Sequence, residues 1–291
     1  MIAGLWLPIV TPFKDGAVDF KSYERLIGHY LSLGIDGVFP LGTTGEQPTL
    51  DEAEVDEIVE RTVAVVAGRV PVFVGVGGNA TRKVEKALKR LERHAFDGIV
   101  SVCPYYNRPS QDGLVAHFRA IAAATGRDVV IYNIPYRTAV NLSNDSLLEL
   151  AEVGNIVGVK DSSGSIAQSL DLLARRPAGF SVLTGEDALY FTMMASGAQG
   201  GILAASHVMT GRFAEVGKAF ARNDVDGARA AWAPLAPLVP LLFAEANPMP
   251  IKYLLWRQGL IASPECRLPL TKISDGLARR LDSLVAQRAA A

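Results

Sequence analysis

The residue with the clearest chemical potential is a lysine at the end of an apolar run. The stretch NIVGVKDSSG, from Asn155 to Gly164, places Lys160 after β-branched residues that are typical of a buried strand. Burial of an ammonium group usually lowers its pKa. A lysine that loses its proton near neutral pH is a nucleophile for carbonyl carbon and forms a Schiff base. The alternative is a lysine that only extends from the strand end into solvent.

Polar side chains end several of the other apolar runs. The motifs are GTTGE, with Thr43 and Thr44, CPYYNRPS, with Tyr105 and Tyr106, YNIPYRT, with Tyr132 and Arg137, and TGED. A tyrosine has an ordinary pKa near 10 and moves protons only through a hydrogen-bonded relay. Tyr132, Thr43 and Tyr106 can form such a relay, and Arg137 with the GTTG amides can bind a carboxylate. These residue types favour a Schiff-base reaction of a 2-oxo acid, whose enamine attacks an aldehyde.

The elements that must position these groups are short strands alternating with helices. Eight runs at regular spacing are predicted to be strands: Leu5–Val10, Gly37–Leu41, Val70–Val76, Gly98–Val102, Val129–Ile134, Ile156–Lys160, Ser181–Thr184 and Gly201–Ala204. Between them, apolar residues recur at helical spacing, and Thr49 with Glu52 forms a predicted capping box. The pattern predicts an α/β protein with a (β/α)8 TIM barrel, with a doubly wound sheet as the second possibility. In such barrels the carboxyl ends of the strands form the active site.

The pattern changes near Asp224, after which no strand-like run follows. We therefore predict a catalytic barrel over residues 1–223 and a C-terminal segment of three helices over residues 224–291. A proline-rich break at NPMPIK interrupts the helical pattern of this segment.

Composition narrows the class of protein further. The 291 residues are 49% hydrophobic and 20% charged, and the net charge is −1 without a basic run, so the sequence does not predict nucleic-acid binding. The apolar stretch WAPLAPLVPLLF contains three prolines and is too short to cross a bilayer, so no membrane association is predicted. Two cysteines, Cys103 and Cys266, provide no disulfide framework, and a cytoplasmic setting is expected.

Two other kinds of site receive little support. GVGGNA, from Gly75, resembles a dinucleotide fingerprint, but the acid expected at the end of the next strand is missing, since Asp97 precedes that strand. The four histidines are scattered and form no ligand cluster, so no metal is predicted.

Taken in order, GTTGE, PYYNRPSQDG, YNIPYRT, GVKD and NPMPIK resemble the dihydrodipicolinate synthase / N-acetylneuraminate lyase family of class I aldolases. The resemblance extends over nearly the whole chain and implies a barrel with a helical C-terminal segment, no cofactor, and pyruvate bound covalently to Lys160. It implies a proton-relay triad of Tyr132, Thr43 and Tyr106, with Tyr106 reaching a neighbouring subunit. Thr44, Gly185 and Ile202 match pyruvate-pocket positions, and Arg137 matches the arginine that holds the carboxylate of aspartate semialdehyde.

Within this family, Arg137 favours condensation of pyruvate with L-aspartate 4-semialdehyde to 4-hydroxy-tetrahydrodipicolinate, on the route to lysine. The last strand, GGILAASHV, differs from the G-V-I-S-V-T-A-N of typical synthases. The alternatives are a pyruvate-dependent aldolase, lyase or dehydratase for another 2-oxo acid, and a non-catalytic paralogue. The resemblance also implies small-molecule substrates and a homo-oligomer, most simply a dimer of dimers.

Overall fold

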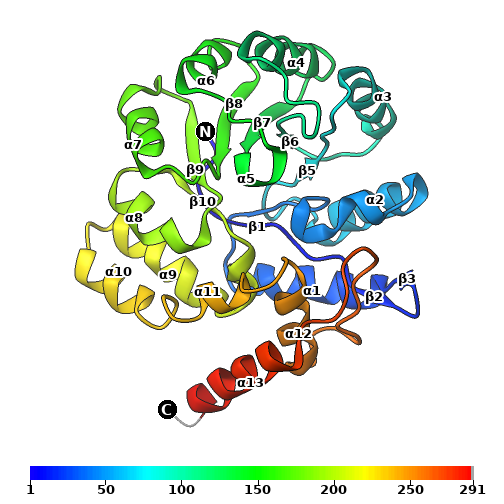
Figure 1. Cartoon of the computed structure of the whole chain (residues 1–291), viewed down its shortest axis with the longest axis vertical. Helices are drawn as coiled ribbons and strands as arrows, with labels where there is room; N and C mark the ends of the chain where they lie inside the picture. The colour runs from blue at the N-terminus through cyan, green and yellow to red at the C-terminus, as the bar shows by residue number, and fades with distance from the viewer. Residues whose placement is uncertain (290–291) are drawn as a thin grey trace.

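Eight parallel strands form the centre of the molecule (Figure 1). The computed structural model describes the backbone of residues 1–289 and the side chains of residues 1–283. The strands are β1 (Gly4–Leu7), β4 (Gly37–Val38), β5 (Phe73–Gly75), β6 (Gly98–Val102), β7 (Asp128–Asn133), β8 (Ile156–Asp161), β9 (Ser181–Thr184) and β10 (Gly200–Ile202). Their order is β4-β1-β10-β9-β8-β7-β6-β5, and a parallel bridge between Val38 and Val72 joins the two edges. This confirms the predicted barrel and excludes the doubly wound sheet.

The predicted strands are all present, but several end earlier than expected. The second was predicted to reach Leu41, whereas β4 ends at Val38. Phe39 still donates its N–H to the carbonyl of Leu7 at 2.8 Å, but Pro40 has no N–H to donate, and Leu41 turns the chain with φ of 61°. A two-stranded hairpin, β2 (Phe13–Lys14) and β3 (Ala17–Val18), was not predicted.

Helices surround the barrel. They are α1 (Phe20–Ser32), α2 (Glu52–Val66), α3 (Thr81–Leu91), α4 (Gln111–Ala123), α5 (Pro135–Thr138), α6 (Asn144–Leu150), α7 (Ile166–Arg175), α8 (Tyr190–Ala195) and α9 (Thr210–Ala221). Short 3₁₀ turns precede α2, α8 and α9, and they include η1 (Thr43–Gly45), η2 (Gln47–Thr49) and η3 (Asp187–Leu189).

The predicted capping box of α2 was wrong by two residues. Asp51 is the N-cap, its side chain accepts the N–H of Glu54 at 2.8 Å, and Glu54 accepts the N–H of Asp51 at 3.1 Å. Thr49 instead belongs to η2, and its hydroxyl donates to the carbonyl of Glu46 at 2.9 Å. Two short turns therefore separate the strand end from the helix, which the spacing of polar residues did not predict.

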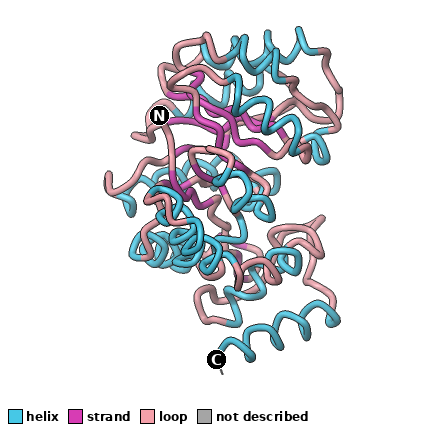
Figure 2. Tube along the Cα trace, turned by 90° about the vertical axis from the view of Figure 1, so that its left-hand side faces the viewer, coloured by secondary structure: helices cyan, strands magenta, loops and turns pink. Residues whose placement is uncertain are grey.

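The C-terminal segment is helical, as expected, and contains a short fourth helix. Its elements are α10 (Val225–Trp232), α11 (Val239–Leu242), α12 (Met249–Arg257) and α13 (Asp275–Ala289). In both views α12 and α13 lie at one edge of the molecule, and α13 extends away from the strands (Figures 1 and 2). A domain boundary at residue 224 stays a prediction. Throughout residues 1–289, we find no helix with the length and apolar character that a bilayer crossing requires.

Two hydrophobic clusters stabilise the barrel. The inner cluster consists mostly of strand residues and includes Trp6, Phe73, Val100, Tyr132 and Ile202. A larger cluster lies between the strands and the surrounding helices. The two layers hold the strands rigidly, so side chains at the carboxyl ends of the strands have fixed positions.

Candidate active site

Lys160 and Tyr132 lie side by side on neighbouring strands near their carboxyl ends. Tyr132 of β7 is in register with Lys160 of β8, so both side chains point to the same side of the sheet. The Nζ atom of Lys160 lies 4.2 Å from the centroid of the Tyr132 ring and 5.4 Å from that of Phe39. Lys160 is only 6% exposed, so it does not simply extend into solvent.

The surroundings of Lys160 favour its neutral form. Burial lowers the pKa of the Lys160 ammonium to about 8, and Arg137 acts in the same direction, while Asp187 and Glu186 oppose the shift. A substantial fraction of this amine is therefore unprotonated at pH 7 to 8 and is available as a nucleophile. Burial also raises the pKa of the Tyr132 hydroxyl above its ordinary value, so Tyr132 remains protonated and able to donate a hydrogen bond.

Gly185, directly after β9, leaves space for the side chain of Lys160. Gly185 follows β9, and its N–H donates to the carbonyl of Asp161 at 2.8 Å. A Cβ atom at this position would lie 2.7 Å from Cε of Lys160 and 2.3 Å from Oγ of Ser162. Any side chain at Gly185 would therefore displace the side chain of Lys160 or of Ser162.

Three of the predicted site residues line one cavity of 370 Å³ above the barrel. Thr43 comes from η1, Tyr132 from β7 and Arg137 from α5. Arg137 is exposed and also lines an adjacent cavity of 580 Å³, which Gly185 borders. The guanidinium therefore borders both cavities. Lys160 lines neither of them, but its Nζ lies beside the rings of Phe39 and Tyr132, which line the first.

Thr44 and Ile202 are buried and line neither of the two cavities. Thr44 is 3% exposed, and its Oγ1 atom accepts a hydrogen bond from Nδ2 of Asn247 at 2.9 Å. Ile202 of β10 is 1% exposed and packs in the same inner cluster as Phe39 and Tyr132. Both residues shape the site, and neither offers an exposed functional group.

Tyr106 lies on the surface of the single chain and does not line the cavity. Its side chain is 89% exposed, and its backbone has φ of 77°, a conformation that tyrosine rarely adopts. Tyr105, its neighbour, lines the cavity instead.

Two acids were not among the predicted site residues. Glu186 and Asp187 begin the loop after β9, and both interact electrostatically with Lys160. Asp187 is 5% exposed and accepts the N–H of Ala205 at 2.6 Å, and burial raises the pKa of its carboxyl. The sequence could have indicated these two acids, because the TGED motif places them directly after a predicted strand of the same barrel. Within residues 1–283, no group of three or more metal-ligating side chains comes together.

The chain is similar to known proteins over nearly its whole length. Residues 1–288 match the dihydrodipicolinate synthetase family. A 4-hydroxy-tetrahydrodipicolinate synthase 2 of Clostridium acetobutylicum is 48% identical, covering 98% of this chain and 99% of that protein. A dihydrodipicolinate synthase of Aquifex aeolicus has the same fold, with a TM-score of 0.96 and 37% identity over 99% of this chain and 98% of that one.

A dihydrodipicolinate synthase variant described as monomeric is also similar, with a TM-score of 0.96 and 35% identity over 99% of this chain and 97% of that one. Both the sequence match and the structural match extend through the barrel and the C-terminal helices. The chain belongs to the dihydrodipicolinate synthetase family.

Proposed function

We propose that this protein condenses pyruvate with L-aspartate 4-semialdehyde to give 4-hydroxy-tetrahydrodipicolinate and water. The observation that carries the proposal is the buried Lys160 beside Tyr132, with a lowered pKa and a neighbouring cavity that an arginine lines. A coupled assay of the purified protein with pyruvate and a panel of aldehydes tests it. Turnover only with an aldehyde other than aspartate semialdehyde would contradict the proposal.

The reaction proceeds through the lysine. The neutral amine of Lys160 attacks C2 of pyruvate, and loss of water leaves a protonated Schiff base. Removal of a proton from C3 gives the enamine, which forms a carbon–carbon bond to the aldehyde carbon while the aldehyde oxygen takes up a proton. The amino group of the second substrate then attacks C2, closes the ring and releases Lys160. The Schiff base is itself the electron sink, so the proposed chemistry needs no metal or organic cofactor.

Proton transfer is assigned to Tyr132, with Thr43 and Tyr106 as the other members of the relay. Tyr132 lies beside Nζ of Lys160 and lines the same cavity as Thr43, which supports this assignment. Thr44, Gly185 and Ile202 are assigned to the pyruvate pocket. Gly185 lies against Lys160, Ile202 packs in one cluster with Phe39 and Tyr132, and Thr44 follows Thr43 in η1.

Arg137 is assigned to the carboxylate of the aldehyde substrate. We expect Arg137→Ala to raise the KM for aspartate semialdehyde about 10- to 100-fold, since hydrogen bonds to a charged group contribute about 1.5–3 kcal/mol. Steady-state kinetics would show this change, with pyruvate adduct formation nearly unchanged. Arg119→Ala, an exposed arginine of α4 paired with Glu149, is the control. An equal loss for both substrates would identify Arg137 as a structural residue.

We further propose a homo-oligomer, most simply a dimer of dimers, in which Tyr106 completes the site of a neighbouring subunit. The support is the 89% exposure of this tyrosine, which does not line the cavity of its own chain although the adjacent Tyr105 does. Sedimentation should show an assembly of four chains, and Tyr106→Phe should lower kcat about 10²-fold or more. Coexpression of the Tyr106→Phe and Lys160→Ala chains should restore activity, because hybrid pairs contain one complete site. A fully active monomer would contradict this proposal.

A cytoplasmic location belongs to the same proposal. Cys103 and Cys266 are both free thiols, which agrees with a reducing compartment.

A further inference from the structure

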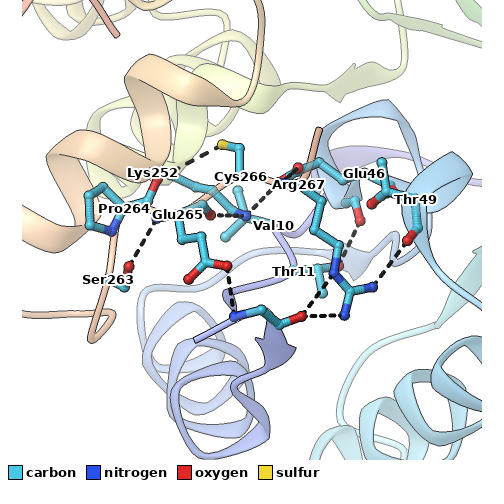
Figure 3. A network of polar contacts seen from close by, with 12 residues as sticks. Val10, Thr11, Glu46, Thr49, Lys252, Ser263, Pro264, Glu265, Cys266 and Arg267 are labelled. Carbon is cyan, nitrogen blue, oxygen red and sulfur yellow. Dashed lines mark hydrogen bonds and ion pairs between the residues drawn. The ribbon is translucent and has the colours of Figure 1, made fainter. Parts of the chain in front are cut away.

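A buried ion pair connects the turn that carries Thr43 to the C-terminal segment (Figure 3). Glu46 closes the GTTGE motif and is 3% exposed, while Lys252 closes NPMPIK and is 0% exposed. Nζ of Lys252 donates to Oε1 of Glu46 and, at 2.8 Å, to the carbonyl of Glu265. The N–H of Arg267 donates to Oε2 of Glu46 at 3.0 Å, so the C-terminal segment binds both carboxylate oxygens.

The same turn is held at two further points. Asn247, the first residue of NPMPIK, donates to Thr44 at 2.9 Å, and the hydroxyl of Thr11 donates to the carbonyl of Gly45 at 2.7 Å. Thr43 thus lies next to three consecutive residues that are each fixed from outside the turn. Its own side chain is left directed to the cavity that it lines.

The backbone of Glu46 explains why the turn needs to be held. Glu46 has φ of 53° and ψ of 32°, the left-handed conformation, which is unfavourable for a residue with a Cβ atom. It lies between the two 3₁₀ turns, as the C-cap of η1 and the N-cap of η2. Such a conformation persists only where surrounding contacts enforce it, and here the carboxylate bonds supply those contacts.

The stability of the fold does not by itself explain why Glu46 and Lys252, a charged pair, occupy this buried position. A buried ion pair contributes little net stability compared with well-packed apolar residues of the same volume, because both groups lose their hydration. Nζ of Lys252 lies 4.1 Å from the centroid of the Phe13 ring, and the Arg267 guanidinium lies 4.4 Å from it, so two cations contact one buried ring. An apolar pair could fill this volume, but it could not fix the turn through directed bonds.

We propose that Glu46 and Lys252 are positioning residues for the reaction, which hold the turn from Gly42 to Glu46 so that the Thr43 hydroxyl stays in the proton relay. The inference rests on the proposed function, since it assigns Thr43 a part in proton transfer. It gives the C-terminal segment a role in catalysis although none of its charged side chains needs to touch the substrate. Lys160 lies on β8 and is not part of this network, so its reaction with pyruvate does not depend on the ion pair.

The test uses the full chain and pyruvate alone. Enamine formation exchanges the methyl protons of pyruvate for deuterium in D₂O, which nuclear magnetic resonance measures, and borohydride trapping measures Schiff-base formation. We expect Lys252→Met to slow methyl exchange by about 10-fold or more and to leave the trapped fraction at saturating pyruvate within about 2-fold of the original protein. Arg257→Met is the control, since Arg257 is on the same helix and forms an exposed ion pair with Asp282. It should change neither the rate of methyl exchange nor the trapped fraction.

A double-mutant cycle separates positioning from a general structural effect. In a Thr43→Val background, Lys252→Met should slow exchange by less than about 3-fold, because the hydroxyl that it positions is already absent. An equal fold-loss in both backgrounds, or unchanged exchange in folded Lys252→Met, would overturn the inference.

A replacement variant and the unsubstituted protein serve as controls for the Lys252→Met experiment. If Lys252→Met does not fold, Glu46→Gln/Lys252→Met takes its place, because it leaves no unpaired buried charge and keeps the volume. Absence of methyl exchange in the unsubstituted protein would contradict the proposed function itself. Exchange that is present and insensitive to these substitutions would contradict only the positioning role.

Discussion

Lys160→Ala is expected to lower kcat by about 10⁴-fold or more, the range in which loss of an essential nucleophile falls. The reason is chemical: without the amine no Schiff base forms. The other lysine that is buried among residues 1–283, Lys252, is bonded to Glu46 and to the carbonyl of Glu265. Coupled assays with long incubation times would measure the residual rate.

The substitution should leave the fold intact, because it removes a buried amine and adds no charge. Circular dichroism and the melting temperature would verify this. Lys218→Ala is the matched control, since Lys218 is an exposed lysine near the opposite, amino-terminal end of the strands, where it lines a cavity with Gly4. A Lys160→Ala protein with more than a few per cent of the original activity would exclude the Schiff-base mechanism.

Tyr132→Phe is expected to have the second largest effect, a loss of about 10²–10⁴-fold in kcat. The ring and its contact with Lys160 remain, and only the hydroxyl that transfers protons is removed. The KM for pyruvate should therefore change much less than kcat, because the interaction lost is one that matters in the transition state.

Methyl-proton exchange of pyruvate provides an independent readout for this variant. It should slow in parallel with kcat, while borohydride still traps the Schiff base at saturating pyruvate. Tyr253→Phe, whose hydroxyl donates to Asp282 on the C-terminal helices, should have no effect on either rate. If Tyr132→Phe raised KM and left kcat unchanged, the tyrosine would serve binding and not proton transfer.

The barrel could be predicted because its strands are regular in spacing and in composition. β6 and β9 have the predicted bounds, and all eight strands occur where β-branched runs were found. The errors lie at the strand ends that form the site, where local rules fail: Leu41, Glu46 and Tyr106 all have positive φ without being glycine. Propensity and periodicity describe common conformations, so they do not predict conformations that distant contacts enforce.

The candidate site was predictable to the extent that strand-end residues mark it. Lys160, Tyr132, Thr43 and Arg137 come together because each follows or ends a parallel strand, which the motifs showed directly. Contacts between segments far apart in the chain were not predictable: Glu46 and Lys252 are 206 residues apart, and neither motif indicates its partner. The depressed pKa of Lys160 was expected from burial. The TGED motif placed Glu186 and Asp187 after a strand, but their opposition to this pKa shift was not predicted.

Trapping of the pyruvate adduct tests the central claim most directly. The purified protein is treated with pyruvate and borohydride at a series of pH values, digested, and examined by mass spectrometry. The account predicts a single adduct on Lys160. Because the pKa of this ammonium is lowered to about 8 and only the neutral amine attacks, the initial trapping rate should rise with pH below that value and level off above it. An adduct on another lysine, or none at any pH, would contradict the account.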